Sequence, residues 1–248
     1  MNKDFSENIV YSEEIYNEFN GFAICLWTMR PLTEHKLSVK NIIAADGCID
    51  LVVDFAKREI GFVGMSRTDF NFIINLPTWS MGIRMMPGAF HQLTGLAASE
   101  AMDDFLEIEG IFPAFDQNLF FGLSFDKAKE YLKTFFAEKV KGKKPDEFTE
   151  LFHTLSESSL GAAGEFYKML HFGPRQCQRL FAKHYGISPK MVLSIVRFQK
   201  CLEILTSANA KPVDILGITD YYDQSHFIND FRNNMGITPL ELIHAYRS

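Results

Sequence analysis

The feature that most constrains this chain is a pattern that occurs twice near its C-terminal end, with an offset of fifty residues. Six residues recur at that offset: Phe181, Gly186, Ile187, Ser188, Pro189 and Arg197 return as Phe231, Gly236, Ile237, Thr238, Pro239 and Arg247. A fixed period that includes Gly and Pro at matched places indicates two copies of one supersecondary unit.

The first copy predicts two helices joined by a short turn. An apolar stretch at residues 162–170 has helical spacing and stops before Gly173. Pro174 then opens a second helix at residues 174–185, because the first helical position tolerates a missing N–H. Gly186 ends that helix, since glycine readily adopts the left-handed conformation found after many helices.

The second copy repeats this arrangement. A short helix is predicted at residues 212–216, and Asp223 is a good N-cap for a second helix at residues 224–235 that Gly236 ends. Two helices joined by a turn of about three or four residues are typical of a helix-turn-helix.

Polar donors occupy the outer face of the second helix in each copy. Arg makes two-pronged hydrogen bonds to guanine, and Gln or Asn makes them to adenine. The solvated face of an ordinary helical bundle explains one copy equally well, but two copies in register favour a DNA-reading interpretation.

The segment between the copies, residues 189–206, is apolar on nearly every side, which predicts a buried helix. At 1.5 Å per residue it spans roughly 27 Å. That length suits two reading helices placed about one DNA turn apart, roughly 34 Å, so one chain can read two successive major grooves.

Two groups of motifs in this region resemble the AraC-type DNA-binding domain. Its first half resembles the runs RQCQRLF at 175–181, GISP at 186–189 and RFQ at 197–199. Its second half resembles YYDQSHF at 221–227, Phe231 and GITP at 236–239. The resemblance implies a bacterial transcription regulator that binds double-stranded DNA through two helix-turn-helix units.

The resemblance also assigns side chains to DNA by their position. Bases would be read by Arg175, Gln178 and Arg179 from the first unit and by Gln224, Ser225 and Asn229 from the second. Phosphates would be contacted by Lys183, Lys190, Lys200 and Arg232.

The N-terminal half has the periodicity of short strands. Residues 1–19 are expected to be a frayed start or an edge strand, and further strands are expected at 22–27, 49–55, 60–64, 70–75 and 81–86, before a helix at 89–98. Regular spacing of short strands predicts a sandwich or barrel. The motifs DGCIDL at 46–51, GIR at 82–84 and PGA at 87–89 are similar to a cupin-like domain that accompanies some AraC-type regulators.

We therefore predict an α+β fold with a cupin-like β-sandwich or barrel and an all-α C-terminal domain. The expected parts are a sensor and dimerisation domain at 1–123, a helical linker at 124–159 and the DNA-binding domain at 160–248. An amphipathic helix is expected at 124–140. It either packs on its own domain or joins two chains, and we expect a homodimer.

Charge is divided unevenly along the chain. Residues 160–248 hold 10 Lys and Arg against 7 Asp and Glu, a net of +3, whereas the remaining residues hold 15 against 24, a net of −9. A net of +3 is small for a DNA binder, so we expect salt-sensitive binding that dimerisation strengthens.

Signatures of enzymes and cofactor sites are missing from the sequence. It has no His-x-His pair, Gly-rich phosphate loop or Gly-x-Ser-x-Gly motif, so no metal, cofactor or catalytic activity is predicted. The four cysteines have no paired spacing, and no secretion signal or membrane segment is evident, which predicts a cytoplasmic protein. A small-molecule effector is expected from the architecture alone.

Two other interpretations remain open at this point. One is a cupin-like small-molecule binding protein or enzyme with a degenerate helix-turn-helix tail. The other is a protein-interaction module that kept the fold and lost its affinity for DNA.

Overall fold

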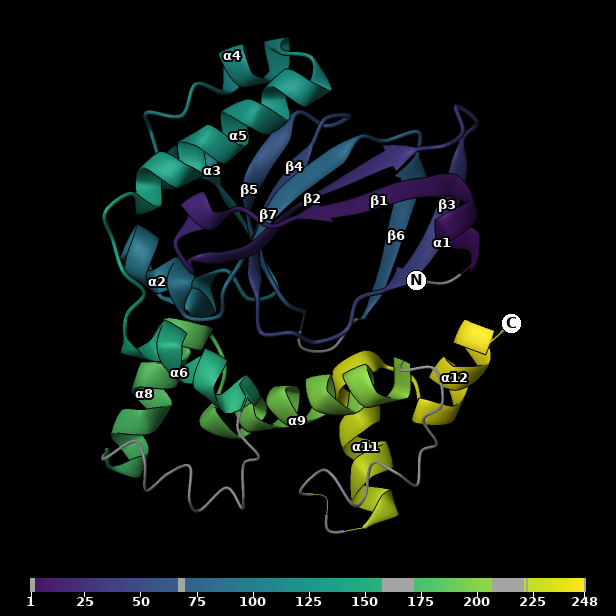
Figure 1. Ribbon diagram of the computed structural model, residues 1–248, viewed down its shortest axis with the longest axis vertical. Coiled ribbons are helices and arrows are strands. Elements are labelled where there is room, and N and C mark those ends of the chain that lie inside the picture. Colours follow the sequence, from purple (N-terminus) through teal and green to yellow (C-terminus); the bar gives the residue numbers. More distant parts are fainter. Residues whose placement is uncertain (1–2, 67–69, 158–171, 207–220, 222, 248) are drawn as a thin grey trace.

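The computed structural model describes residues 3–66, 70–157, 172–206, 221 and 223–247. It combines an N-terminal antiparallel sheet domain with a C-terminal helical region (Figure 1), which confirms the predicted α+β class. Among these residues, no helix has both the length and the apolar character needed to cross a bilayer.

The main sheet of the described region has the strand order β1-β2-β7-β4-β5-β8, and all neighbouring strands are antiparallel. Its strands are β1 (Ile9–Glu14), β2 (Ala23–Pro31), β4 (Ile49–Asp54), β5 (Glu59–Gly64), β7 (Ser80–Met85) and β8 (Phe105–Glu107). Strand β1 is the expected edge strand, and β2, β4, β5 and β7 overlap the strands predicted there.

A row of apolar side chains crosses four of these strands and forms the centre of the core. Leu26 is paired with Ile83, Ile83 with Leu51, and Leu51 with Phe62. All four side chains are at most 1% exposed, because paired residues of adjacent strands point to the same face of a sheet. The ring of Phe90 packs on Phe62 at 5.3 Å and covers this row.

Strands β3 (Leu37–Ile42) and β6 (Asn71–Leu76) form a separate two-stranded sheet. The sequence predicts β6 but not β3. Val39 and Ile74 of this small sheet share a core of their own with Phe5 and Ile9. The cupin-like character of the domain stays a prediction.

Short helices connect and cover the strands. They are α1 (Lys3–Asn8), η1 (Asn17–Phe19), α2 (Ala89–Thr94), η2 (Ala98–Glu100), α3 (Ile108–Ile111) and α4 (Gln117–Gly122). The helix predicted at 89–98 ends early, since Gly95 has a φ of +78° and caps α2 through a hydrogen bond from its N–H to the carbonyl of His91.

Helix α5 (Phe125–Val140) has the predicted bounds and amphipathic character. Its buried stripe, Ala128, Leu132, Phe136 and Val140, packs into the core of the sheet domain. Phe136 lies edge-on to Phe19 at 5.0 Å. The apolar stripe is therefore used within the chain, and the homodimer stays a prediction.

The helical region contains α6 (Glu147–Glu157), α8 (Pro174–Tyr185), α9 (Pro189–Thr206), α11 (Gln224–Met235) and α12 (Pro239–Arg247). Helices α8, α9 and α11 have the bounds that the sequence predicts. The first helices of the two units, expected at 162–170 and 212–216, lie outside the described residues. Although α6 falls in the predicted linker, it packs on α8 and α9, with Phe148 edge-on to Phe181.

Candidate nucleic-acid interface

Helix α8 is the predicted reading helix of the first unit. It begins at Pro174 and is capped at its end by Gly186, whose φ is +74°. Its inner face buries Cys177, Phe181, His184 and Tyr185. The helical period of 3.6 residues then places Arg175, Arg179 and Lys183 on one stripe of the opposite face, and all three side chains are exposed.

Helix α11 is the predicted reading helix of the second unit. The Asp223 side chain caps it by accepting a 2.7 Å hydrogen bond from the backbone N–H of His226, and Gly236 ends it with a φ of +75°. Phe227 and Phe231 face inward and are at most 1% exposed. The inner face of this helix is therefore mainly apolar, as in α8, although each helix also buries one polar residue, Asn234 here and His184 in α8.

The structure leaves all the predicted base-reading side chains exposed: Arg175, Gln178, Arg179, Gln224, Ser225 and Asn229. Of the predicted phosphate contacts, Lys183, Lys190 and Arg232 are exposed, whereas Lys200 is half-buried. Their roles toward DNA stay predictions.

Helix α9 connects the two reading helices and carries one at each end (Figure 1). Ser188 caps its start by accepting a hydrogen bond from the backbone N–H of Met191 at 3.2 Å. The side chains of Val192, Ile195 and Phe198 are fully buried, as the apolar sequence predicts. Phe198 packs against Phe231 of α11 with ring centroids 5.0 Å apart.

A polar cluster locks α11 onto α9, and the sequence interpretation did not identify it. Asp230 accepts hydrogen bonds from the hydroxyls of Ser194 at 2.6 Å and Tyr221 at 2.7 Å. The guanidinium of Arg197 lies 3.9 Å from the same carboxylate. Asn234 donates to the Ser194 hydroxyl at 2.8 Å.

A signal for this cluster exists in the sequence. Asp230 lies three residues after Phe227 and next to Phe231, so it borders the inward face of its helix. Ser194 is a polar residue within the nearly all-apolar helix α9. Since a buried polar group requires a partner, two such residues on facing helices indicate a contact.

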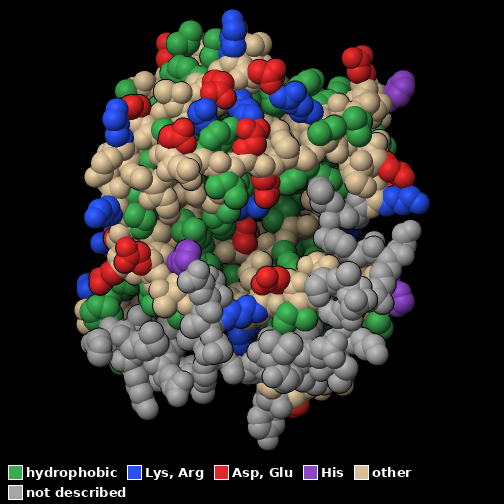
Figure 2. Space-filling model, in the orientation of Figure 1, with side chains coloured by type: hydrophobic (Ala, Val, Ile, Leu, Met, Phe, Trp, Pro, Cys, Tyr) green, Lys and Arg blue, Asp and Glu red, His purple; other side chains and the backbone are tan. Residues whose placement is uncertain are grey.

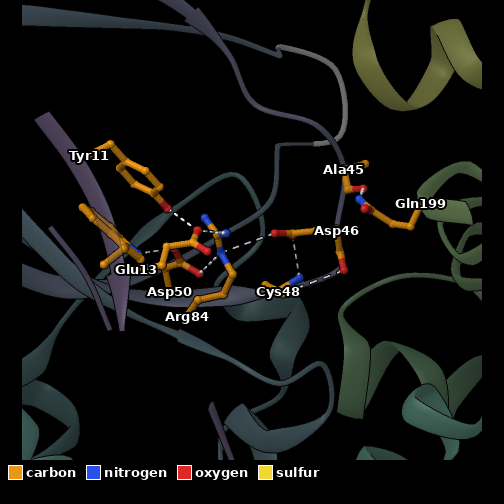
Figure 3. Close-up of polar contacts among 9 residues, drawn as sticks. Tyr11, Glu13, Ala45, Asp46, Cys48, Asp50, Arg84 and Gln199 are labelled. Atoms are coloured by element: carbon orange, nitrogen blue, oxygen red, sulfur yellow. Dashed lines mark hydrogen bonds and ion pairs between the residues drawn. The ribbon is translucent and has the colours of Figure 1, made fainter. Parts of the chain in front are cut away.

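A second polar cluster lies inside the sheet domain, around Arg84 of β7 (Figure 3). The Arg84 guanidinium lies 3.3 Å from Glu13, 3.6 Å from Asp46 and 3.6 Å from Asp50. Trp27 donates its indole N–H to Asp50 at 2.8 Å. Three carboxylates thus surround one cation, which leaves the cluster with a formal excess of negative charge.

Burial shifts the pKa values in this cluster. Burial raises the pKa of Asp50 to about 7, and the opposing effect of the Arg84 cation is smaller. Burial also lowers the pKa of Arg84, but the carboxylates of Asp50 and Asp46 outweigh this effect and raise it overall. Asp50 consequently changes charge near neutral pH.

The Arg84 cluster is connected to the helical region through one loop. Asp46 belongs to the cluster, and its neighbour Ala45 accepts a hydrogen bond from the side-chain amide of Gln199 on α9 (Figure 3). On the face shown in Figure 2, a hollow bordered by hydrophobic side chains lies between the sheet domain and the helices, with charged side chains inside it.

In the part of the chain that the structure describes, no group of three or more His, Cys, Asp or Glu side chains is arranged to hold a metal ion. The four cysteines are buried and carry thiol groups. Burial raises the pKa of Cys25 to about 12, which keeps its thiol protonated at neutral pH.

Family models match the two parts of the chain separately. Residues 167–245 match a model described as a helix-turn-helix domain, and residues 18–107 match one described as a domain of unknown function (DUF6597). A comparison with curated proteins gives no match.

Several solved structures of ToxT from Vibrio cholerae are similar to the chain over 96% of its length. An apo form has 11% sequence identity and a TM-score of 0.42, with 96% of that chain covered. A form bound to an unsaturated fatty acid has 12% identity and a TM-score of 0.40, with 94% covered.

Proposed function

We propose that this chain, which contains an AraC-type helix-turn-helix domain, is a sequence-specific DNA-binding transcription regulator. The observation that carries the proposal is the pair of reading helices, α8 and α11, at the two ends of the buried helix α9. Both expose polar side chains of the kinds that read base edges while their apolar faces are buried.

The two reading helices contribute differently to binding. Helix α8 carries the exposed cations Arg175, Arg179 and Lys183, so it supplies most of the attraction to phosphates. Helix α11 exposes one cation, Arg232, among its proposed DNA contacts, and it presents mainly hydrogen-bonding groups. We assign guanine reading to Arg175 and Arg179 of α8. We assign adenine reading to Gln178 of α8 and to Gln224 and Asn229 of α11.

The N-terminal domain is proposed to make DNA binding responsive to a small-molecule effector. The Arg84 cluster supports this role, because it gathers three carboxylates around one half-buried cation, and removing charges from water costs free energy that contacts of 3.6 Å offset poorly. The loop that contains Ala45 and Asp46 gives the cluster a direct connection to α9. The chemical identity of the effector is left open.

We also propose that the active species is a homodimer. The helical region has a net charge of +3 by sequence, and a second copy doubles the number of phosphate contacts. Sedimentation at several protein concentrations, with and without duplex DNA, tests this. A species that stays monomeric on DNA at saturating concentration contradicts it.

Substitution of Arg179 separates base reading from simple charge attraction. In Arg179→Lys the charge is kept but the planar fork that pairs with guanine is lost. We expect this variant to keep the salt dependence of binding and to relax the preference at one base position, whereas Arg179→Ala loses roughly 1–3 kcal/mol of specific binding. Unchanged preference in both variants contradicts the assignment.

A further inference from the structure

The N-terminal domain contacts both reading helices at their C-terminal ends. The contacting residues of the two helices occupy equivalent positions in the fifty-residue repeat. A Cβ atom at Gly186 would lie 2.6 Å from the Met102 side chain, and one at Gly236 would lie 3.2 Å from the ring of Phe70. Gly186 and Gly236 are separated by the repeat offset of fifty residues. A side chain at Gly186 would therefore overlap Met102, whereas one at Gly236 would crowd the ring of Phe70.

The positions two residues earlier in each helix are held as well. His184 lies edge-on to His91 of α2, with 4.7 Å between the ring centroids. Its repeat equivalent, Asn234, accepts a 2.8 Å hydrogen bond at its backbone carbonyl from the N–H of Ala45. The same side of each helix end thus meets the same domain.

The two attachments differ in strength. Phe181 and Tyr185 of α8 belong to one continuous apolar core with the sheet domain. The core of the second unit is separate, and among the described residues of the N-terminal domain only Ile42 and Ala44 pack against it. The second unit is held instead by a small patch, Ala45 and Phe70, to which Gln199 also contributes a hydrogen bond.

The two segments that form the patch are hydrogen-bonded to each other. The backbone N–H of Ile43 donates a 2.9 Å hydrogen bond to the carbonyl of Phe70, which ties the two contacting segments together. The proposed base-reading side chains of α11, such as Asn229, stay exposed. Docking therefore fixes where α11 lies and leaves its outer face open.

We infer that the N-terminal domain positions the second reading helix relative to the first, and so helps to select the spacing between the two halves of the DNA site. Phe70 and Gln199 are positioning residues in this arrangement. The inference rests on the proposed DNA-binding function. Its physical basis is that the Asp230 cluster and the Phe198–Phe231 contact attach α11 to α9. The patch adds a second attachment at the C-terminal end of α11 and further restrains rotation of α11 about α9.

Spacing is the quantity that this restraint affects most. One inserted base pair moves the second half of a site by about 3.4 Å along the duplex and turns it by roughly 34°. A rigid pair of reading helices loses contacts when the second half turns, whereas a loosely joined pair adjusts. Affinity for a single half-site does not depend on the restraint.

The experiment measures the affinity of full-length protein for duplexes recovered by selection with the wild type, and for the same duplexes with one base pair added or removed between the halves. The variants are Phe70→Ala and Gln199→Ala. The matched control is Phe72→Ala, since Phe72 is two residues away and 45% exposed. Thermal unfolding of each protein confirms that it is folded.

We expect the wild type and Phe72→Ala to lose about tenfold or more in affinity when the spacing changes. Phe70→Ala and Gln199→Ala should lose less than about threefold in affinity when the spacing changes. Phe70→Leu should restore part of the dependence of affinity on spacing. Equal spacing dependence in all folded proteins overturns the inference. If the wild type enriches no duplex at all, the proposed function fails instead. Should Phe70→Ala not fold, Gln199→Ala decides alone.

Discussion

Ser194 on α9 donates a 2.6 Å hydrogen bond to the carboxylate of Asp230 on α11, within the contact between the connecting helix and the second reading helix. Tyr221 donates to the other oxygen of the same carboxylate. The second unit is thus fixed to α9 by a specific polar contact as well as by apolar packing. Replacing Asp230 should therefore weaken both the stability and the geometry of this unit.

For Asp230→Ala we predict a loss of roughly 1–3 kcal/mol in the free energy of unfolding, because the hydroxyls of Ser194 and Tyr221 lose their acceptor inside the contact. Denaturant unfolding measures this. Asp126→Ala is the control: its carboxylate is 79% exposed in a surface ion pair, so its loss should be below about 1 kcal/mol. Equal effects of the two substitutions contradict the proposed lock.

Substitution of Gly186 and substitution of Gly95, two glycines at similar helix ends, should differ in their effect on stability. Gly186 and Gly95 both have left-handed backbone angles, but only at Gly186 would an added Cβ meet Met102. Gly95→Ala should cost about 1–2 kcal/mol of stability from backbone strain, and Gly186→Ala should cost roughly 1–3 kcal/mol more from overpacking. Thermal or denaturant unfolding of both variants gives the comparison, and similar losses would argue against tight docking of α8.

Lys183 lies on the exposed cationic stripe of α8, and its removal should change how binding depends on salt. We predict that Lys183→Ala reduces the slope of log affinity against log salt concentration by about 0.9, the value for one phosphate contact. Lys127→Ala on α5 is a matched helical control that is also exposed. A slope that is unchanged in Lys183→Ala removes this residue from the phosphate contacts.

Asp50 predicts a pH dependence of stability. Its pKa is raised to about 7, first by burial and then by the nearby Asp46, against the opposing effects of Arg84 and Trp27. Because the folded state holds the proton more tightly than the unfolded state, this stabilisation is complete below about pH 4 and is lost as the pH rises to about 7.

The test compares unfolding free energies of the wild type and Asp50→Asn at pH 5 and pH 8. The wild type should lose stability over this interval relative to Asp50→Asn, which has no titrating group at this position. A constant difference between the two proteins across the interval would show that Asp50 does not titrate there.

Local signals made the helical region predictable from the sequence. Pro174 and Asp223 mark helix starts, and Gly186 and Gly236 mark helix ends, through backbone preferences that act within one turn. The observed bounds of α8 and α11 agree with these signals. Strand β4 was predicted equally well, since its alternating Ile49, Leu51 and Val53 are buried on one face.

Contacts between distant parts of the chain were not predictable in this way. The Arg84 cluster joins side chains from β1, β4, β7 and the loop before β4, and no short sequence motif indicates that these side chains contact one another. The separate pairing of β3 with β6 spans a long sequence distance. The contact between Ala45 and Asn234 likewise depends on how two domains dock, which a single sequence does not specify.

The most direct test of the account is a selection of duplexes from random DNA by the full-length protein, repeated at two salt concentrations. We predict that the protein enriches a DNA sequence in two parts, whose centres are separated by about one turn of the duplex, roughly 10 base pairs. We also predict that Arg179→Lys relaxes the base preference at one position, in one of the two parts of the enriched sequence only. Recovery of no enriched sequence at either salt concentration, with folded protein, would contradict the account.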